Sequence, residues 1–256
     1  MKSKFYSLAL AAGMLSLTAC SDDNTNDSNN DKGNGIENGS ILKGTITEDV
    51  TLKAGNTYKL SGEYIVEAGA TLNIEEGVKI ISVYDNIVDY ILVKQGAKIN
   101  AVGTPDKPIV MTSEKEEPGA WGGIHICGKA HTNAEGGKGS SEIGGAVYGG
   151  NDDADNSGTL QYIRLEYTGF AFDEEHEANG ISFYGVGNGT IVDHCEAYKG
   201  SDDGFEFFGG SVNVSNMVVV SCSDDSFDWT EGWNGKGTDL VAYQEAKATL
   251  GYDCDC

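Results

Sequence analysis

Hydrophobic and polar residues recur as a fixed phrase in the second half of the chain. The segment SDDGFEFFGG at residues 201–210 returns 22 residues later as SDDSFDWTEG, and a weaker copy, ANGISFYG, lies 24 residues upstream at 178–185. A recurrence of this length, strand-like and rich in Gly and Asp, is typical of a coiled solenoid. Each copy would then be one coil, hydrogen-bonded to the next at a spacing of about 4.8 Å.

Stacking of coils places each position of the phrase in a column. Because side chains alternate along a strand, neighbouring columns face opposite ways. Two apolar columns are predicted to face inward: Ile181, Phe205 and Phe227, and Phe183, Phe207 and Trp229. A third column is predicted to face outward: Ser182, Glu206 and Asp228. The sequence therefore predicts an apolar inner wall beside an acidic outer stripe.

The first half of the chain carries a similar repeat with a longer interval. Residues 64–74 (YIVEAGATLNI) are echoed by 91–101 (ILVKQGAKINA), which sets Gly69 against Gly96, 27 residues later. The longer interval predicts a turn that bulges out near residues 83–89. Residues 124–158 and 170–177 show little periodicity, so we expect two long loop excursions there.

The N-terminus has the pattern of an export signal. Lys2 and Lys4 precede an apolar run at residues 5–17, and Leu17-Thr18-Ala19-Cys20 follows. This predicts a cleaved signal peptide at 1–19 that is too short to remain as a membrane span. The Leu-Thr-Ala-Cys sequence resembles the bacterial lipobox, which implies that Cys20 becomes the lipidated N-terminus. An ordinary secretory signal with an incidental Cys is the alternative.

The residues after Cys20 predict a tether and a surface location. Ser21-Asp22-Asp23 resembles the acidic export tag of Bacteroidetes surface lipoproteins, although it also fits the start of an acidic linker. Residues 20–40 are too polar to bury a core, so we expect a disordered tether there, followed by one domain at 41–256. The expected location is the outer membrane, lipid-anchored and facing the exterior.

Composition agrees with an extracellular solenoid. Gly makes up 36 of 256 residues, about twice its usual share of ~7%. The net charge of −23 argues against binding to nucleic acid, and leaves the lipid as the only expected contact with a membrane. Apart from Cys20 the odd number of cysteines leaves at least one thiol unpaired within the chain, with the connectivity open. These cysteines are Cys127, Cys195, Cys222, Cys254 and Cys256.

Longer motifs resemble a known superfamily. The run GAKINAVGTPDKPIVMTS followed by WGGI resembles coils of right-handed parallel β-helix proteins of the pectate-lyase-like superfamily. The segments DDADNSGTLQYIRLEY, SDDGFEFFGGSVNV and DDSFDWTEGW are similar to Bacteroidetes surface lipoproteins of unestablished activity. The resemblance covers residues 41–256 and implies an all-β fold, a right-handed parallel β-helix. We expect such proteins to continue beyond Cys256, so either the chain is a truncated form or its last coil is covered.

The acidic stripe allows three interpretations. Carboxylates on adjacent coils could form a catalytic pair, bind a cation such as Ca²⁺, or be solvated. The catalytic residues would be Asp202, Asp203, Glu206, Asp225 and Asp228. We expect Asp203 and Asp225 to bind a stabilising Ca²⁺. Related hydrolases carry Gly-His-Gly and Arg-x-Lys elements that are missing here, and Arg164, the single Arg, is expected to pair with Glu166, which weighs against catalysis.

A second candidate calcium site lies further upstream. Asp153, Asp155 and Ser157 place oxygens at alternate positions before Gly158, which suits a loop wrapped around one ion. Arg164 stands where an EF-hand would have its bidentate Glu, so this would be a different kind of calcium loop. An Asp/Asn-rich turn without metal is the alternative.

The function expected from the sequence is binding of an extracellular ligand at the cell surface. A glycan is the first choice for this ligand, and a surface protein is the second. Trp121, Tyr148 and Trp233 lie near turns or loops and are the candidate stacking platforms for sugar rings, unless they pack against their own coils. A polysaccharide lyase or glycosidase that uses the acidic face is the competing hypothesis. A structural or adhesive surface protein is the third.

Overall fold

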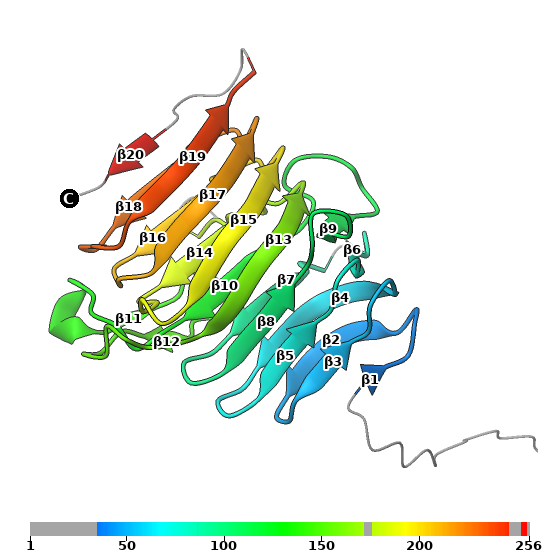
Figure 1. The fold of residues 1–256 in the computed structure, drawn as a ribbon, viewed down its shortest axis with the longest axis horizontal. Helices are drawn as coiled ribbons and strands as arrows, with labels where there is room; N and C mark the ends of the chain where they lie inside the picture. Colours follow the sequence, from blue (N-terminus) through cyan, green and yellow to red (C-terminus); the bar gives the residue numbers. More distant parts are fainter. Residues whose placement is uncertain (1–34, 86, 172–175, 246–251, 255–256) are drawn as a thin grey trace, which may run out of the picture. The chain divides into compact units, whose positions relative to one another are not determined.

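The computed structural model describes residues 35–85, 87–171, 176–245 and the backbone of 252–254. Cys20, the predicted signal peptide and the tether up to residue 34 lie outside this part. The described residues form a right-handed parallel β-helix, with 18 strands joined in one sheet that winds around the core (Figure 1). The first strand, β1, begins at Gly35, within the range predicted as tether. No helix in the described part is long and apolar enough to cross a membrane.

Three faces make up each coil. Face 1 contains β1 (Gly35–Ile36), β3 (Val50–Leu52), β5 (Thr71–Ile74), β8 (Lys98–Val102) and the first halves of β13 (Gly158–Glu166), β15 (Ile191–Tyr198), β17 (Asn213–Val220) and β19 (Gly237–Tyr243). Face 2 contains the first halves of β2 (Ile41–Ile46) and β4 (Thr57–Val66), then β6 (Lys79–Ser82), β9 (Ile109–Ser113) and the second halves of β13, β15, β17 and β19. Face 3 contains the second halves of β2 and β4, then β7 (Tyr90–Val93), β10 (Ile124–Cys127), β14 (Ile181–Tyr184), β16 (Phe205–Phe208), β18 (Phe227–Thr230) and β20 (Tyr252–Cys254).

The corner between faces 1 and 2 is formed by a single residue in the later coils. The residues at this corner have positive φ: 52° for Tyr162, 53° for His194, 53° for Asn216 and 54° for Asp239. One residue with positive φ bends the strand and reverses the alternation of inward and outward side chains. Leu160 and Ile163, on either side of Tyr162, therefore both point into the core.

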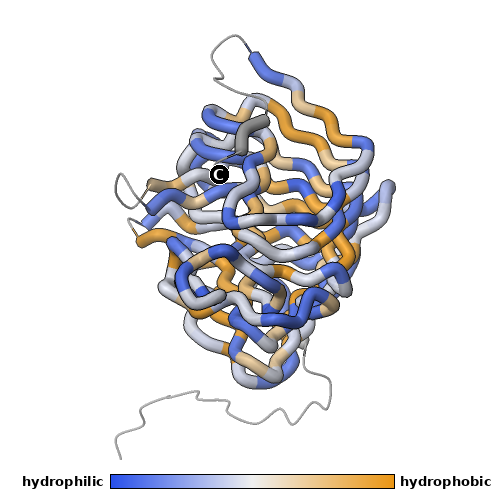
Figure 2. The backbone as a smooth tube through the Cα atoms, turned by 90° about the vertical axis from the view of Figure 1, so that its left-hand side faces the viewer, coloured by the Kyte–Doolittle hydropathy of each residue, from blue (hydrophilic) through white to orange (hydrophobic). Residues whose placement is uncertain are grey.

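The predicted columns are confirmed. Phe205 pairs with Ile181 on one side and Phe227 on the other, and the outward column pairs Glu206 with Ser182 and Asp228. The rings of Phe183 and Phe207 stack at 5.1 Å, and those of Phe205 and Phe227 at 5.7 Å. Figure 2 shows hydrophobic segments at matching places in successive coils. Burial of each such side chain contributes about 1.5–3 kcal/mol, so the columns are the main source of stability.

The repeat of 27 residues in the first half is confirmed as well. Tyr64 pairs with Ile91 across β4 and β7, and the amide of Gly69 donates to the carbonyl of Gly96 at 3.0 Å. The intervening residues 83–89 contain no strand in the described part and leave the coil as the expected bulge.

The first excursion folds back over the outer side of face 3. It contains a short 3₁₀ helix (Glu135–Gly137) and a hairpin of β11 (Gly139–Ser140) and β12 (Val147–Tyr148). Its apolar side chains pack on outward-facing residues of face 3, and together they form a second core. The members of this second core are Tyr90, Leu92, Cys127, Ile143, Ala146, Tyr148, Ala178, Tyr184 and Phe208.

The second core lies beside the outer stripe, which was predicted to face outward with its solvation left open. Within the stripe Ser182 is fully buried and Glu206 is half-buried, and the neighbouring outward residue Tyr184 is fully buried. The excursion supplies the cover, because its hairpin packs on the outside of β7, β10, β14 and β16.

Candidate functional site

Carboxylates gather at the entrance to face 3 in two successive coils. Asp202 and Asp203 precede β16, and Asp224 and Asp225 precede β18 at the same place in the next coil. Glu206 and Asp228 extend the group along the strands. We call these six residues the acidic stack. Asp202, Asp203 and Asp225 are each less than a tenth exposed, so the acidic stack is largely withdrawn from water.

A ladder of side chain to backbone hydrogen bonds holds the turns in register. The amide of Asp203 donates to Asn179 Oδ1 at 3.2 Å, and the amide of Asp225 donates to Asp203 Oδ1 at 2.8 Å. Asn179 also donates from Nδ2 to Glu206 Oε2 at 2.5 Å. Asn179 was missed from the sequence, although it occupies the place of Asp203 and Asp225, two residues before a strand of face 3.

Burial and mutual repulsion favour the protonated carboxyls. Burial, followed by the charges of Glu177 and Asp224, raises the pKa of Asp202 to about 7. Burial and the charge of Asp202 raise the pKa of Asp203 to about 9, although the amide of Asp225 works against this. Burial, then Asp203, places the pKa of Glu206 well above its ordinary value. The acidic stack therefore holds protons at neutral pH unless a cation replaces them.

Two trios within the acidic stack have the spacing of metal ligands. Asp203, Glu206 and Asp228 each offer an oxygen within 4.8 Å of the other two, as do Asp202, Asp203 and Asp224. Asp203, predicted as a calcium ligand, belongs to both trios. Asp225, predicted with it, belongs to neither. Three carboxylates supply at most six oxygens, the lower end of what Ca²⁺ requires.

The excursion adds a further carboxyl above the acidic stack. Glu142 accepts a hydrogen bond from the hydroxyl of Tyr184 at 3.4 Å, and burial raises its pKa to about 7. His125, in the same outward column of face 3 as Ser182, is fully buried with Nε2 2.7 Å from the carbonyl of Gly122. Burial lowers the pKa of His125 to about 4, so its ring is neutral and contributes no positive charge.

The predicted calcium loop at 153–157 uses its oxygens within the protein. Asp153 Oδ1 accepts hydrogen bonds from the Nδ1 and the backbone amide of His131 at 2.8 and 3.1 Å. Ser157 is buried and donates its hydroxyl to Asp155 Oδ2 at 3.2 Å. No third Asp, Glu, His or Cys of the described residues joins Asp153 and Asp155 at ligand distance. This arrangement agrees with the alternative of an Asp-rich turn.

Two of the three predicted sugar platforms are buried, and the third is half-buried. Trp121 is 1% exposed and donates Nε1 to the carbonyl of Glu166 at 2.8 Å. Tyr148 is 2% exposed and donates its hydroxyl to the carboxylate of Glu231. Trp233 is half-buried, with its ring 4.6 Å from that of Phe207. The expectation of exposed platforms is wrong for Trp121 and Tyr148. The ring of Trp121 packs in the inner core of the β-helix, and that of Tyr148 packs in the second core.

Arg164 and the described cysteines have structural roles. Arg164 pairs with Glu166, as predicted, and with Glu196 on the next coil, both at 2.6 Å. Cys127, Cys195 and Cys222 are free thiols and all are buried. Burial raises the pKa of each to about 12, so none is a nucleophile in this state. The side chains of Cys254 and Cys256 lie outside the described residues.

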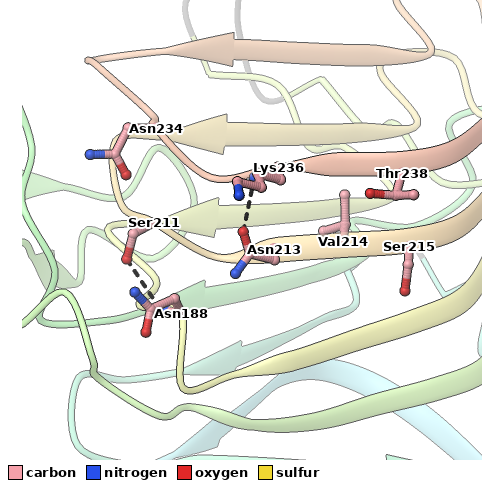
Figure 3. A pocket seen from close by; sticks show the side chains of 8 residues that line it. All are labelled: Asn188, Ser211, Asn213, Val214, Ser215, Asn234, Lys236 and Thr238. Atoms are coloured by element: carbon pink, nitrogen blue, oxygen red, sulfur yellow. Dashed lines mark hydrogen bonds between the residues drawn. The ribbon is translucent and has the colours of Figure 1, made fainter.

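A polar groove of about 450 Å³ lies at the start of face 1 in the last coils (Figure 3). Its side chains come from three successive coils and consist mainly of amides and hydroxyls. The residues that line the groove are Asn188, Ser211, Asn213, Val214, Ser215, Asn234, Lys236 and Thr238. The sequence repeat contained this groove as a column of Asn and Ser, but it was not recognised, because polar residues at a turn are common without a ligand.

Hydrogen bonds fix the floor of the polar groove and leave amides at its rim. Ser211 donates to the carbonyl of Asp153 at 2.7 Å, and Asn213 Oδ1 accepts from the amide of Lys236 at 3.0 Å. The side-chain amides of Asn188 and Asn234 are exposed and form no hydrogen bond with the described residues. Each amide offers two donors and one acceptor to a ligand.

Residues 44–256 match the family model of the pectate-lyase like beta helix domain. No curated protein and no solved structure matches the chain. The match begins within β2 and includes every later strand, with the acidic stack and the polar groove. This span is well over half of the 256 residues. The chain therefore belongs to the family of the pectate-lyase like beta helix domain.

Proposed function

We propose that the protein is a surface-anchored lipoprotein whose β-helix binds an extracellular glycan in the polar groove on face 1. The observation that carries the proposal is the groove, where exposed amides of Asn188 and Asn234 at one end and hydroxyls of Ser215 and Thr238 at the other line one surface. Amides and hydroxyls match the alternating donors and acceptors of sugar hydroxyl groups. The family description, which names pectate lyase, also supports a role that involves carbohydrate.

The charge of the protein points to a glycan without strong negative charge. The chain carries 40 acidic and 17 basic side chains, so an acidic polysaccharide is repelled at long range. Lys236 is the one charged residue among those that line the polar groove. A single exposed cation attracts little at physiological ionic strength, so hydrogen bonds to neutral sugars are the main expected source of affinity.

The proposed location rests on the N-terminal sequence alone. Leu17-Thr18-Ala19-Cys20 supplies the lipid attachment site, and Ser21-Asp22-Asp23 supplies the tag of the Bacteroidetes type. Lipid at Cys20 would anchor the chain to the outer membrane, and the tether would carry the β-helix outside the cell.

A glycan array tests the proposal directly. The chain from Ser21 onward, which lacks the lipid, is applied to neutral and acidic glycans with and without calcium. Binding to neutral glycans should be lost in the double variant Asn188→Ala with Asn234→Ala. The matched control is Asn73→Ala with Asn100→Ala, which removes two amides from face 1 in distant coils. No binding to any glycan, or equal loss in both double variants, would contradict the assignment of the groove.

One observation favours an enzyme as the second candidate. Glu206 and Asp203, whose pKa values are raised by burial, lie beside Asp228, which suits a general acid next to a second carboxyl. Substrate would have to reach them beneath the excursion. Hydrolysis of a polysaccharide that is lost in both Glu206→Gln and Asp228→Asn would support this candidate over simple binding.

Calcium is proposed as the counter-ion of the acidic stack. The trio of Asp203, Glu206 and Asp228 presents oxygens at suitable spacing, and an ion there would replace the protons that the carboxyls otherwise hold. In this role the ion stabilises the turns before β16 and β18 and takes no part in a reaction.

A further inference from the structure

The excursion follows β10 and is hydrogen-bonded to the turn between β18 and β19, three coils further along the β-helix. His131 Nε2 lies 2.9 Å from the carbonyl oxygen of Gly232, and His131 Nδ1 lies 2.8 Å from Asp153 Oδ1. Thr132 donates its hydroxyl to Glu231, and Tyr148 donates to both oxygens of the same carboxylate at 2.8 and 2.9 Å. Two backbone hydrogen bonds, from the amide of Gly210 to the carbonyl of His131 and from the amide of Asn133 to the carbonyl of Glu231, and the second core under the excursion add to the closed arrangement.

The two partners of the His131 ring are both acceptors. A carbonyl oxygen and a carboxylate oxygen have no proton to donate, whereas a neutral imidazole has only one N–H. Both contacts are therefore satisfied only when both ring nitrogens carry protons, that is, in the imidazolium form. In the neutral form one ring nitrogen would direct a lone pair at an oxygen less than 3 Å away.

We propose that residues 128–157 form a lid over the acidic stack, and that protonated His131 is the latch that holds it shut. Below the pKa of the latch, His131 donates both to Asp153, within the lid, and to Gly232, on the turn after β18, and the excursion stays on face 3. Above it, one bond of the latch is lost and the lid opens more often. The carboxyls beneath the lid then become accessible to solvent, cations or a substrate.

The charged groups around the latch and beneath the lid all favour the closed lid at low pH. Burial lowers the pKa of His131, but the bonds to Asp153 and Gly232 and the charge of Asp153 outweigh it and hold the pKa above its ordinary value. On the turn, Glu231 lies next to Gly232 and adds negative charge. Beneath the lid, burial raises the pKa of Glu142 to about 7, and the carboxyl of Asp202 in the acidic stack is close enough to feel its charge.

Each of these closed-state pKa values is raised. Their contribution to closure is complete at low pH and is lost as the pH rises through the closed-state values. Neutral His131 and ionised Glu142 both favour the open lid, so closure should weaken from mildly acidic to alkaline pH.

The thiol of Cys127 reports on opening. It lies in the second core beside the hairpin, and burial raises its pKa to about 12, so it reacts only when the lid is open. Cys195 and Cys222 belong to the inner core of the β-helix and report global unfolding in the same sample. A disulfide reagent that is active in acid, followed by peptide mapping, gives the labelling rate of each cysteine separately.

The test compares variants with the wild type at the same pH, which cancels the intrinsic reactivity of the thiol. Loss of one charge-assisted hydrogen bond changes an equilibrium constant about tenfold, so His131→Gln should label Cys127 about ten times faster at about pH 5.5. As the pH rises and the wild-type ring loses its proton, the ratio should fall toward one. Asp153→Asn should behave in the same way.

His194→Gln is the matched control, because His194 makes an equivalent 2.8 Å contact with Asp193 at a corner outside the lid. It should leave the labelling of Cys127 unchanged. Equal rates for wild type, His131→Gln and Asp153→Asn at acidic pH would overturn the latch. Labelling of Cys195 in step with Cys127 would overturn the lid, because the exposure would then come from global unfolding.

Discussion

Replacing Asp203 by Asn should stabilise the protein at neutral pH. Asp203 is 7% exposed, and its pKa of about 9 means that the folded state retains a proton which the unfolded chain releases near pH 4. Asn keeps the carbonyl oxygen that accepts the amide of Asp225 and never ionises. The substitution thus removes the ionisation that favours unfolding and preserves the ladder of Asn179, Asp203 and Asp225.

The size of the effect follows from the pKa difference. Between the ordinary pKa of 3.8 and about pH 7, the unfolded wild type gains about 1.4 kcal/mol per pH unit by releasing this proton, about 4 kcal/mol in all. Fitting the amide beside Glu206 and Asp228 takes back about 1–2 kcal/mol. We therefore expect Asp203→Asn to be about 2–3 kcal/mol more stable than the wild type at neutral pH.

The pH dependence is the distinguishing result. A raised pKa in the folded state stabilises fully below the unfolded pKa, and that stability is lost as the pH rises toward about 9. The advantage of Asp203→Asn should accordingly vanish near pH 4 and grow with pH. Denaturant unfolding in the presence of a chelator measures it, with Asp106→Asn, an exposed turn residue, as the control. A variant that is less stable than the wild type at neutral pH, by the same amount at every pH, would refute the reasoning.

Three further predictions follow from the site, the core and the N-terminus. Millimolar calcium should raise the melting temperature and a chelator should lower it, because an ion at one hundred times its Kd stabilises the folded state by about 2.7 kcal/mol. The double variant Asp203→Asn with Asp225→Asn should lose this response, and an unchanged melting temperature of the wild type would leave protons as the counter-ions. Phe207→Ala should lower the free energy of unfolding by about 3–5 kcal/mol because the ring is buried in the core, whereas Val147→Ala, at an exposed side chain, should change it by less than about 0.5 kcal/mol. Denaturant unfolding measures both, and similar values for the two variants would contradict the assigned core. Cys20→Ala should move the protein from the membrane fraction to the soluble fraction and abolish incorporation of labelled fatty acid, and retention of the variant in the membrane would disprove lipidation.

The columns of the β-helix could be predicted because stacking repeats one environment in every coil. Phe205 and Phe227 lie one above the other, so two similar phrases in the sequence were enough to set their direction and register. The same signal continues in β20, where Tyr252 and Asp253 pair with Phe227 and Asp228. That copy was missed because the short segment YDC resembles FDW only in its alternation.

The environment outside the coils could not be predicted in the same way. Alternation shows that Ser182 and Glu206 point away from the inner core, but it does not show what covers them. Over the neighbouring outward residues Tyr184 and Phe208 the cover comes from Ile143 and Tyr148, in a segment with no repeat of its own, and their contacts are non-local. For the same reason Tyr148 could not be recognised as a buried residue.

The positive φ at the corner between faces 1 and 2 could not be predicted from the sequence either. Strict alternation along residues 160–167 would place Ile163 and Leu165 on one face and Leu160 on the other, but the positive φ of Tyr162 reverses the pattern, so that Leu160 is inward as well. Gly is the usual signal for positive φ. Tyr162 and His194 gave no such signal, and their stacked rings, 4.5 Å apart, became visible only in the structure.

The contacts between the excursion and Glu231 bear on how the protein folds. In a plain solenoid each coil touches only its neighbours, so end coils can fray one at a time and cooperativity is weak. Here Thr132 and Tyr148 join the coil of β10 directly to the turn after β18, past the coils of β14 and β16. Those intermediate coils cannot open without breaking the bridge, so β10 to β18 should exchange their amide hydrogens as one cooperative unit, whereas β1 to β6 should open in smaller steps.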